Sequence, residues 1–247
     1  MQFRKIVRAS FISSVAAAAL WTSSRPARAN LITNGDFSAN AGSYVTYPGY
    51  SSNFLPNVQA NPASPTGWTI TANYPVGLNG SGTAFTSGTP TPFAPSNMSG
   101  VTDFAFMQDA SNYTGSAISQ VIATVLGQTY TLSYVAAQRI NNPSATMETL
   151  VNNALSGSPI ASQNPTISTA AFTANSLTFT AVSSSTQIVF ENTTSGTNGL
   201  DNTVDVSNVV VSDALPSPAS FGLVSLGGAG LGLLLLKRRT GRTVIAA

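Results

Sequence analysis

The chain has 247 residues, contains no cysteine and no histidine, and only 7% of its residues are charged. Without these two residue types it has no disulfides, no Cys/His zinc site and no Ser-His-Asp or Cys-His catalysis. The formal net charge of +2 is unevenly spread: over residues 30–215 one basic residue, Arg139, stands against all eight acidic ones, a net charge of −7. Such a surface cannot neutralise a row of phosphates, which excludes nucleic-acid binding.

The first 29 residues have the three regions of a secretory signal peptide. Basic residues at 4, 5 and 8 precede an apolar stretch over 9–21 that is too short to span a membrane. Ala27 and Ala29 then form an A-x-A cleavage site around Arg28. We therefore expect an N-terminal signal helix, cleavage by signal peptidase after Ala29, and an exported mature chain that begins at Asn30.

Residues 39–100 are rich in Gly, Pro, Ser, Thr and Asn, with aromatic residues interleaved. Long stretches of this composition without their own apolar pattern usually carry function or are mobile. We expect them to form loops.

From residue 103 onward the pattern changes to short runs typical of β-strands. Tyr130, Leu132 and Tyr134 alternate with polar residues, and so do Ile188 and Phe190. Further apolar or β-branched runs cover 103–108, 117–125, 147–155, 177–181 and 203–212. The run 147–155 also fits one short helical turn, although its neighbours favour a strand. The pattern predicts an all-β, antiparallel sandwich as one domain over residues 30–213.

The last part of the chain, residues 214–247, has a three-part pattern. Pro216 and Pro218 precede an apolar run over 219–236, about 18 residues or about 27 Å of helix. Lys237, Arg238 and Arg239 follow and begin a basic stop over 237–242. The pattern predicts a C-terminal hydrophobic helix, barely long enough for a hydrocarbon core of about 30 Å, that associates with the membrane at least transiently.

This tail resembles the PEP-CTERM sorting signal of Gram-negative bacteria, whose exported proteins are processed by an exosortase. Both prolines, the Gly/Leu run and the arginine cluster match that pattern, whereas Ser217 stands where the family usually has Glu. The resemblance implies an exosortase-like partner and removal of the tail at the cell surface. A plain C-terminal membrane anchor is the alternative.

Four stretches of the body resemble the galactose-binding-domain-like jelly rolls, including those of the domain of unknown function 642 type. They are Asn30–Phe37, Gly67-Trp68, the central residues 119–139 and the closing residues 201–209. The resemblance implies a jelly-roll β-sandwich. Ser207 stands where these families usually have Asp.

Five side chains are candidates for carbohydrate binding. Three of them, Tyr44, Tyr47 and Tyr50, lie in the polar loop, where their rings can stack on a sugar and their hydroxyls can bond it. In the alternative interpretation, the loop packs on itself. Trp68 either stacks on a sugar ring or seals the sandwich. Arg139 is either a bidentate ligand donor or the structural partner of a carboxylate.

The jelly-roll resemblance also implies a structural calcium site, because modules of this kind often hold a calcium ion near the opening strand. Asp36 and Asp201 are its candidate ligands. In the alternative interpretation each carboxylate bonds only the backbone amides of its own turn. No other cofactor is expected.

We expect an exported, non-catalytic protein of the cell surface or extracellular matrix that binds polysaccharide. Two alternatives stay open: a secreted glycan-active enzyme that uses two carboxylates about 5–9.5 Å apart, and a purely structural coat or biofilm component.

Overall fold

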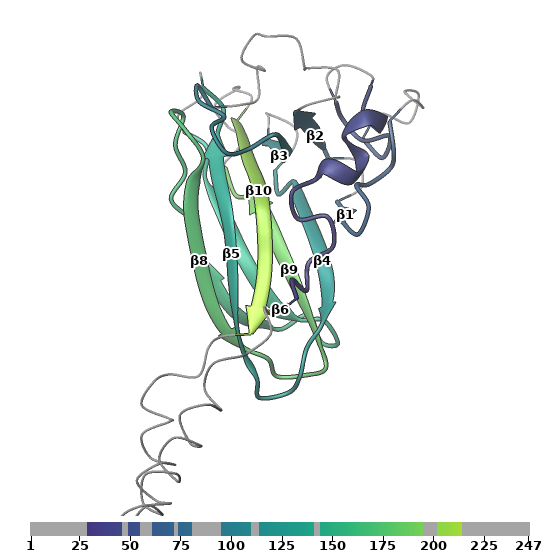
Figure 1. The fold of residues 1–247 in the computed structure, drawn as a ribbon, viewed down its shortest axis with the longest axis vertical. Helices are drawn as coiled ribbons and strands as arrows, with labels where there is room; N and C mark the ends of the chain where they lie inside the picture. The colour runs from purple at the N-terminus through teal and green to yellow at the C-terminus, as the bar shows by residue number, and fades with distance from the viewer. Residues whose placement is uncertain are drawn as a thin grey trace, which may run out of the picture. The chain divides into compact units, whose positions relative to one another are not determined.

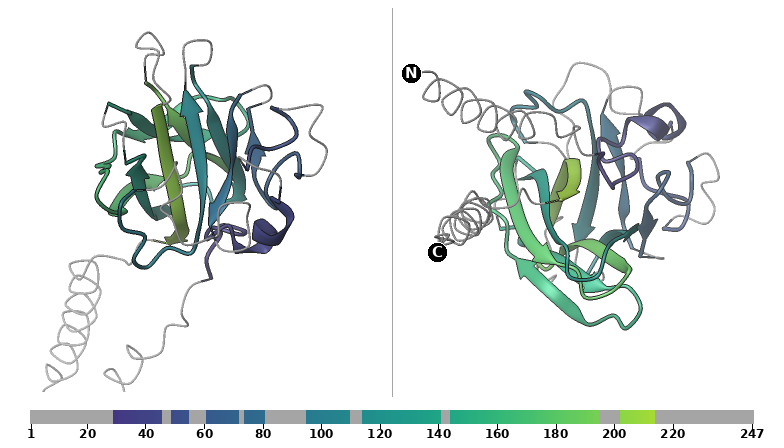
Figure 2. Two further views of the ribbon diagram at one scale, coloured as in Figure 1. Left: turned by 90° about the horizontal axis from the view of Figure 1, so that it is seen from above. Right: turned by 60° about the horizontal axis from the view of Figure 1, so that its bottom comes forward.

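The computed structural model describes residues 29–45, 49–54, 61–71, 74–80, 95–109, 114–140, 144–194 and 202–213. These residues form two five-stranded antiparallel sheets that pack face to face, together with a short 3-10 helix, Ser38–Ser43 (Figure 1). The all-β, antiparallel class predicted from the sequence is confirmed. Two further views show the two layers and the loops around them (Figure 2).

The first sheet has the order β1-β4-β9-β6-β7. Its strands are Thr69–Ile70 (β1), Ala117–Ala123 (β4), Ser185–Asn192 (β9), Met147–Asn153 (β6) and Pro159–Gln163 (β7). The second sheet has the order β2-β3-β10-β5-β8. Its strands are Val76–Gly80 (β2), Asp103–Asp109 (β3), Asn202–Asp213 (β10), Thr129–Gln138 (β5) and Thr173–Thr180 (β8).

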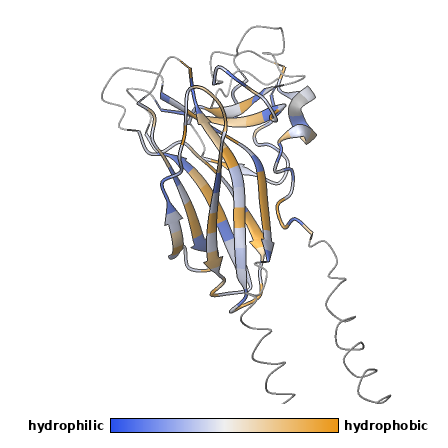
Figure 3. Ribbon diagram, turned by 60° about the vertical axis from the view of Figure 1, so that its left-hand side comes forward, coloured by the Kyte–Doolittle hydropathy of each residue, from blue (hydrophilic) through white to orange (hydrophobic). Residues whose placement is uncertain are grey.

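Alternating side chains of the two sheets meet in the core. Tyr130, Leu132 and Tyr134 of β5 are at most 2% exposed, and Ile188 and Phe190 of β9 are fully buried, as their spacing predicts. Hydrophobic and hydrophilic residues alternate along the strands (Figure 3). Burying a large apolar side chain contributes about 1.5–3 kcal/mol, so this core replaces the disulfides that the chain lacks.

The strand β10 is central to the second sheet and changes neighbour along its length. It pairs with β3 from Asn202 to Val206, and its pairing with β5 has a bulge between Ser207 and Val210. Beyond the bulge the N-terminal segment takes the place of β3. There the Val209 amide donates to the carbonyl of Gly35 (2.9 Å), and the Leu31 amide donates to that of Val211 (3.0 Å).

Some elements differ from their prediction. The stretch 39–100 contains β1 and the completely buried β2, and Tyr50 forms a bridge with Gly77, so it is not loop throughout. The strand β7 is not predicted at all. β4 ends at Ala123 rather than at residue 125, because residues 124–128 form a turn. The ambiguous run 147–155 is a strand, β6.

The predicted signal helix and the apolar run 219–236 with its basic stop lie outside the described residues, as do Pro216 and Pro218. Within the ranges given above, no helix has the length and apolar character needed to cross a bilayer.

Candidate functional site

The opening motif Asn34–Phe37 is a tight turn that holds the N-terminal segment against β10. The Asn34 carbonyl accepts hydrogen bonds from the Trp68 indole (3.0 Å) and the Phe37 amide (3.2 Å). Asn34 and Phe37 have positive φ angles, 53° and 60°, a region in which asparagine is enriched. Gly35 lies so close to the Val209 carbonyl that a Cβ atom would collide with it. The turn therefore fixes the N-terminal segment beside the bulge.

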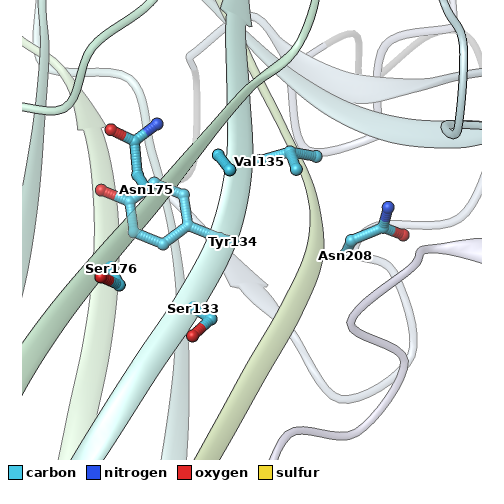
Figure 4. Close-up of a pocket in the computed structure, with 7 residues that line it drawn as sticks. Ser133, Tyr134, Val135, Asn175, Ser176 and Asn208 are labelled. Carbon is cyan, nitrogen blue, oxygen red and sulfur yellow. The ribbon is translucent and has the colours of Figure 1, made fainter.

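The bulge in β10 presents Asn208 at the surface between two hollows. The residue is exposed and has a φ of 52°. The first hollow has a volume of about 360 Å³ and is lined by Ser133, Tyr134, Val135, Ala174, Asn175, Ser176 and Asn208 (Figure 4). The second, of about 500 Å³, is lined by Asn30, Ile32, Asn34, Gly35, Asp36, Asn208, Val209 and Val210. We refer to the two hollows together as the Asn208 groove.

The first hollow combines neutral polar groups with an aliphatic surface. Figure 4 shows Val135 between Asn208 on one side and Asn175 and Ser176 on the other. Ser133 and Ser176 are exposed, so their hydroxyls can bond a ligand. The Asn175 amide instead forms two hydrogen bonds with the backbone of Thr166, at 2.9 and 3.0 Å, which makes it a fixed wall of the hollow.

Asp36 lies in the second hollow and is exposed. Its Oδ1 accepts hydrogen bonds from the amide (3.2 Å) and the hydroxyl (3.0 Å) of Ser38, at the start of the 3-10 helix. Asp201 lies outside the described residues. Among those that are described, no three acidic side chains are grouped so as to hold a metal ion. Calcium binding by Asp36 and Asp201 therefore stays a prediction.

Two of the aromatic candidates lie in the core: Tyr44, which corrects its interpretation as a sugar platform, and Trp68, which agrees with the alternative that this ring seals the sandwich. Tyr44 is 0% exposed, and burial raises the pKa of its hydroxyl. Trp68 is 4% exposed and packs on Phe37 and Phe190, with ring centroids 5.3 and 6.2 Å away. Neither ring offers a face to a ligand.

The structure brings Tyr50 and Arg139 to the same side of the second sheet, the outer face turned away from the core. The Tyr50 hydroxyl donates to Gln108 of β3, and its ring packs on Phe106 at 5.5 Å. Gln108 pairs with Thr203 of β10. The carbonyl of Thr203 accepts a hydrogen bond from the Arg139 backbone amide (3.1 Å). Tyr47 lies outside the described residues.

Asp205, a residue not predicted from the sequence, lies on this outer face opposite Phe106 and Ala137. Its side chain is 0% exposed, and neither carboxylate oxygen has a hydrogen-bond partner in the described part of the chain. Burial raises the pKa of Asp205 well above its ordinary value, and the charge of Arg139 partly opposes that rise. The signal for it was a lone carboxylate between Val204 and Val206 in a β-branched strand.

A pair of carboxylates lies on the outer face of the first sheet. Glu148 of β6 is directly opposite Glu191 of β9. Burial raises the pKa of Glu191, and the charges of Glu148 and Asp109 raise it further. Neither glutamate lines the Asn208 groove.

Comparisons with protein families and with curated proteins find no match. Several solved structures are distantly similar. One is the enzymatically active domain of tailspike protein 4 of bacteriophage CBA120, with 14% identity, a TM-score of 0.44, and coverage of 75% of this chain but 21% of that one. A second is TmCBM61 in complex with β-1,4-galactotriose (9% identity, TM-score 0.43, coverage 75% and 99%). A third is a sugar-binding protein, so described, from Bacteroides thetaiotaomicron (11% identity, TM-score 0.44, coverage 75% and 100%).

Proposed function

We propose that the chain is an exported, non-catalytic protein of the cell surface or extracellular matrix that binds a neutral polysaccharide in the Asn208 groove. The signal peptide and the PEP-CTERM-like tail would direct it there, through signal peptidase and an exosortase-like enzyme. The observation that carries the binding proposal is the lining of the first hollow, in which exposed hydroxyls surround an aliphatic side chain.

This lining matches the chemistry of a sugar ring. A pyranose presents hydroxyls around its edge and C–H groups on its faces. Ser133 and Ser176 supply hydroxyls, and Asn208, whose Nδ2 donates to the Gly100 carbonyl (3.1 Å), supplies its Oδ1 as an acceptor. Val135 and Ala174 supply apolar contact. Because the two hollows share Asn208, they suit successive units of a polymer.

The charge of the body favours an uncharged ligand. With one basic residue against eight acidic ones, the body repels a polymer that carries uronate or sulfate groups. Among the described residues, none with a charged side chain lines the first hollow, and Asp36 is the one that lines the second. We therefore expect neutral glycans to bind more tightly than anionic ones.

A glycan array with the full chain, run with calcium and with a chelator, tests the proposal. Ser176→Trp fills the first hollow and should weaken binding to a neutral glycan by at least about tenfold, a loss of about 1.4 kcal/mol. Thr180→Trp is the matched control, because Thr180 is exposed on the same face of β8 four residues away and lines neither hollow. A silent array, or equal losses in the two variants, would contradict the proposal. Silence would favour the coat or biofilm component.

The glycan-active enzyme is the second candidate, favoured by the pairing of Glu148 with Glu191. A carboxyl with a raised pKa beside a second carboxylate is the acid and partner arrangement of glycosidases. If the chain is a glycan-active enzyme, it should hydrolyse the bound glycan, and Glu191→Gln should abolish that hydrolysis. If the chain only binds glycan, the parent chain should show no hydrolysis, and Glu191→Gln should bind with unchanged affinity.

A further inference from the structure

Three turns meet at the end of the sandwich where β10 ends. They are residues 124–128 between β4 and β5, 153–158 between β6 and β7, and 181–184 between β8 and β9. Figure 1 shows these connections together at the lower end of the strands.

Hydrogen bonds join the three turns to one another. The Gly127 amide donates to the Ala181 carbonyl (2.8 Å), and the Ser183 hydroxyl donates to Asn153 Oδ1 (2.9 Å). The Thr124 amide donates to the Ser184 carbonyl (3.0 Å). The turns therefore form one continuous surface held on the rigid ends of the strands.

The tips of these turns are apolar and exposed. Val125, Leu126, Leu155 and Val182 are 66%, 71%, 74% and 51% exposed. The three turns contain no Asp, Glu, Lys or Arg. Single exposed leucines are common, but four large aliphatic side chains on adjoining turns mark an interaction surface. We refer to these four residues as the turn face.

The course of the chain indicates what covers the turn face. β10 ends at Asp213, which pairs with Tyr130 at the start of β5, next to the turn 124–128. The apolar run begins at Ala219, so residues 214–218 connect the two. Six steps of extended chain span at most about 22 Å. When the apolar run enters a bilayer, the end of β10 therefore lies within about 22 Å of the bilayer surface.

The distribution of charge supports the same occupant. Asp109, Glu148 and Glu191 lie toward the other end of the strands, since Glu191 pairs with Ala117 while Ala123 at the opposite end of β4 pairs with Ser185. Asp213 is the charged residue that ends β10 beside the turns. A bilayer with anionic lipids therefore repels the far end and admits the uncharged turns.

We propose that the turn face docks on the lipid bilayer, so that the sandwich stands with Val125, Leu126, Leu155 and Val182 at the headgroup boundary. Aliphatic side chains at that depth lose water contact, while the strands remain outside. This contact adds to the hold of the C-terminal run and orients the body. It does not depend on glycan binding.

The absence of cysteine allows a site-specific test in the full chain. Single variants Leu126→Cys and Leu155→Cys carry an environment-sensitive fluorophore, and the chain is reconstituted in vesicles of phosphatidylethanolamine and phosphatidylglycerol. We expect a blue shift at both positions and quenching by spin-labelled lipids. Thr193→Cys is the control, because Thr193 is exposed beyond the end of β9, at the far end of the sandwich. Equal spectra at positions 126 and 193 would overturn the proposal.

A charge variant separates docking from anchoring. With the fluorophore at Val182→Cys, the double change Leu126→Glu and Leu155→Glu should reduce the bound fraction of the probe by about tenfold or more, because a carboxylate is costly to bring into the bilayer. The double change Asn164→Glu and Thr166→Glu adds the same charge in the exposed loop between β7 and β8, at the far end of the sandwich, and should leave the signal unchanged. A shift that appears without lipid and grows with protein concentration would overturn the proposal in favour of a second copy of the chain.

Discussion

Asp205 occupies a position where burial penalises its charge. It lies on the outer face of the second sheet between Phe106 and Ala137 in register, with no exposed surface. Arg139 is close enough to favour the ionised form, but burial is the larger influence on its pKa. The protein therefore retains a group that destabilises the fold when it is ionised.

This position predicts a specific dependence of stability on pH. Because the pKa of Asp205 is raised in the folded state, that state holds a proton that the unfolded state has already lost. The free energy of unfolding should fall as pH rises from the ordinary value of 3.8 up to the raised pKa of the folded state. Asp109 and Glu191 are also raised and act in the same direction.

We expect Asp205→Asn to reduce this dependence, because asparagine does not titrate. Melting temperatures of the parent chain and the variant are measured at pH 4, 6 and 8. As pH rises, the melting temperature of the variant should increase relative to that of the parent chain. Parallel curves would show that the pKa of Asp205 is the same in the folded and unfolded states, contrary to the prediction.

The aromatic candidates show what sequence can predict about single residues. Tyr44 and Tyr50 lie in the same polar stretch and look alike in sequence, yet Tyr44 is buried in the core and Tyr50 reaches Gln108 on the outer face. The difference arises from contacts with strands far along the chain, which local composition does not encode. The groove residues Ser133, Ser176 and Asn208 escaped prediction for the same reason.

Among the elements, β10 and the N-terminal segment together position the candidate site. The bulge after Ser207 presents Asn208, and the bond between Val209 and Gly35 places the second hollow beside it. The close approach of the two backbones at Gly35 makes this junction sensitive to added volume.

We therefore expect Gly35→Ala to destabilise the fold by about 1–3 kcal/mol, since the new Cβ collides with the Val209 carbonyl and the segment must shift. Gly42→Ala is the matched control. Position 42 lies in the 3-10 helix with no atom within 4 Å of an added Cβ, so its effect should stay within about 0.5 kcal/mol. Urea unfolding of both variants measures the difference, and similar losses would refute the importance of the junction.

The burial of each strand explains whether the sequence pattern can predict it. β5 and β9 alternate because one side meets the core and the other meets solvent, and both were predicted with the correct face. All five residues of β2 are buried, because residues 49 and 50 pair along its edge and the Phe106 ring lies against Gly77, so β2 lacks alternation. β7 is an edge strand of five residues, none of them buried, and it has no alternating apolar pattern.

The whole molecule separates its charge from its apolar ends. Nine of the ten basic residues belong to the two terminal segments, whereas the body between them carries Arg139 and all eight acidic residues. The composition predicts this division without any structure. The spatial consequence, with uncharged turns at one end of the strands and Asp109, Glu148 and Glu191 toward the other, depends on strand register and could not be predicted from composition.

The expected N-terminal boundary gives a further prediction, because the expected cleavage site lies directly before Asn30, a residue that bonds to the sandwich. Asn30 Oδ1 accepts hydrogen bonds from the Ile32 and Val211 amides, both at 3.0 Å. We expect intact mass and N-terminal sequencing of the exported chain to give a start at Asn30. Ala27→Leu with Ala29→Leu should block cleavage and leave the precursor mass, since signal peptidase needs small residues at these positions. Arg28→Ala, which changes only the middle residue, should be processed normally. A start beyond Ile32 would contradict the prediction, because the sandwich would then lose the Asn30 contacts that hold its N-terminal segment on β10.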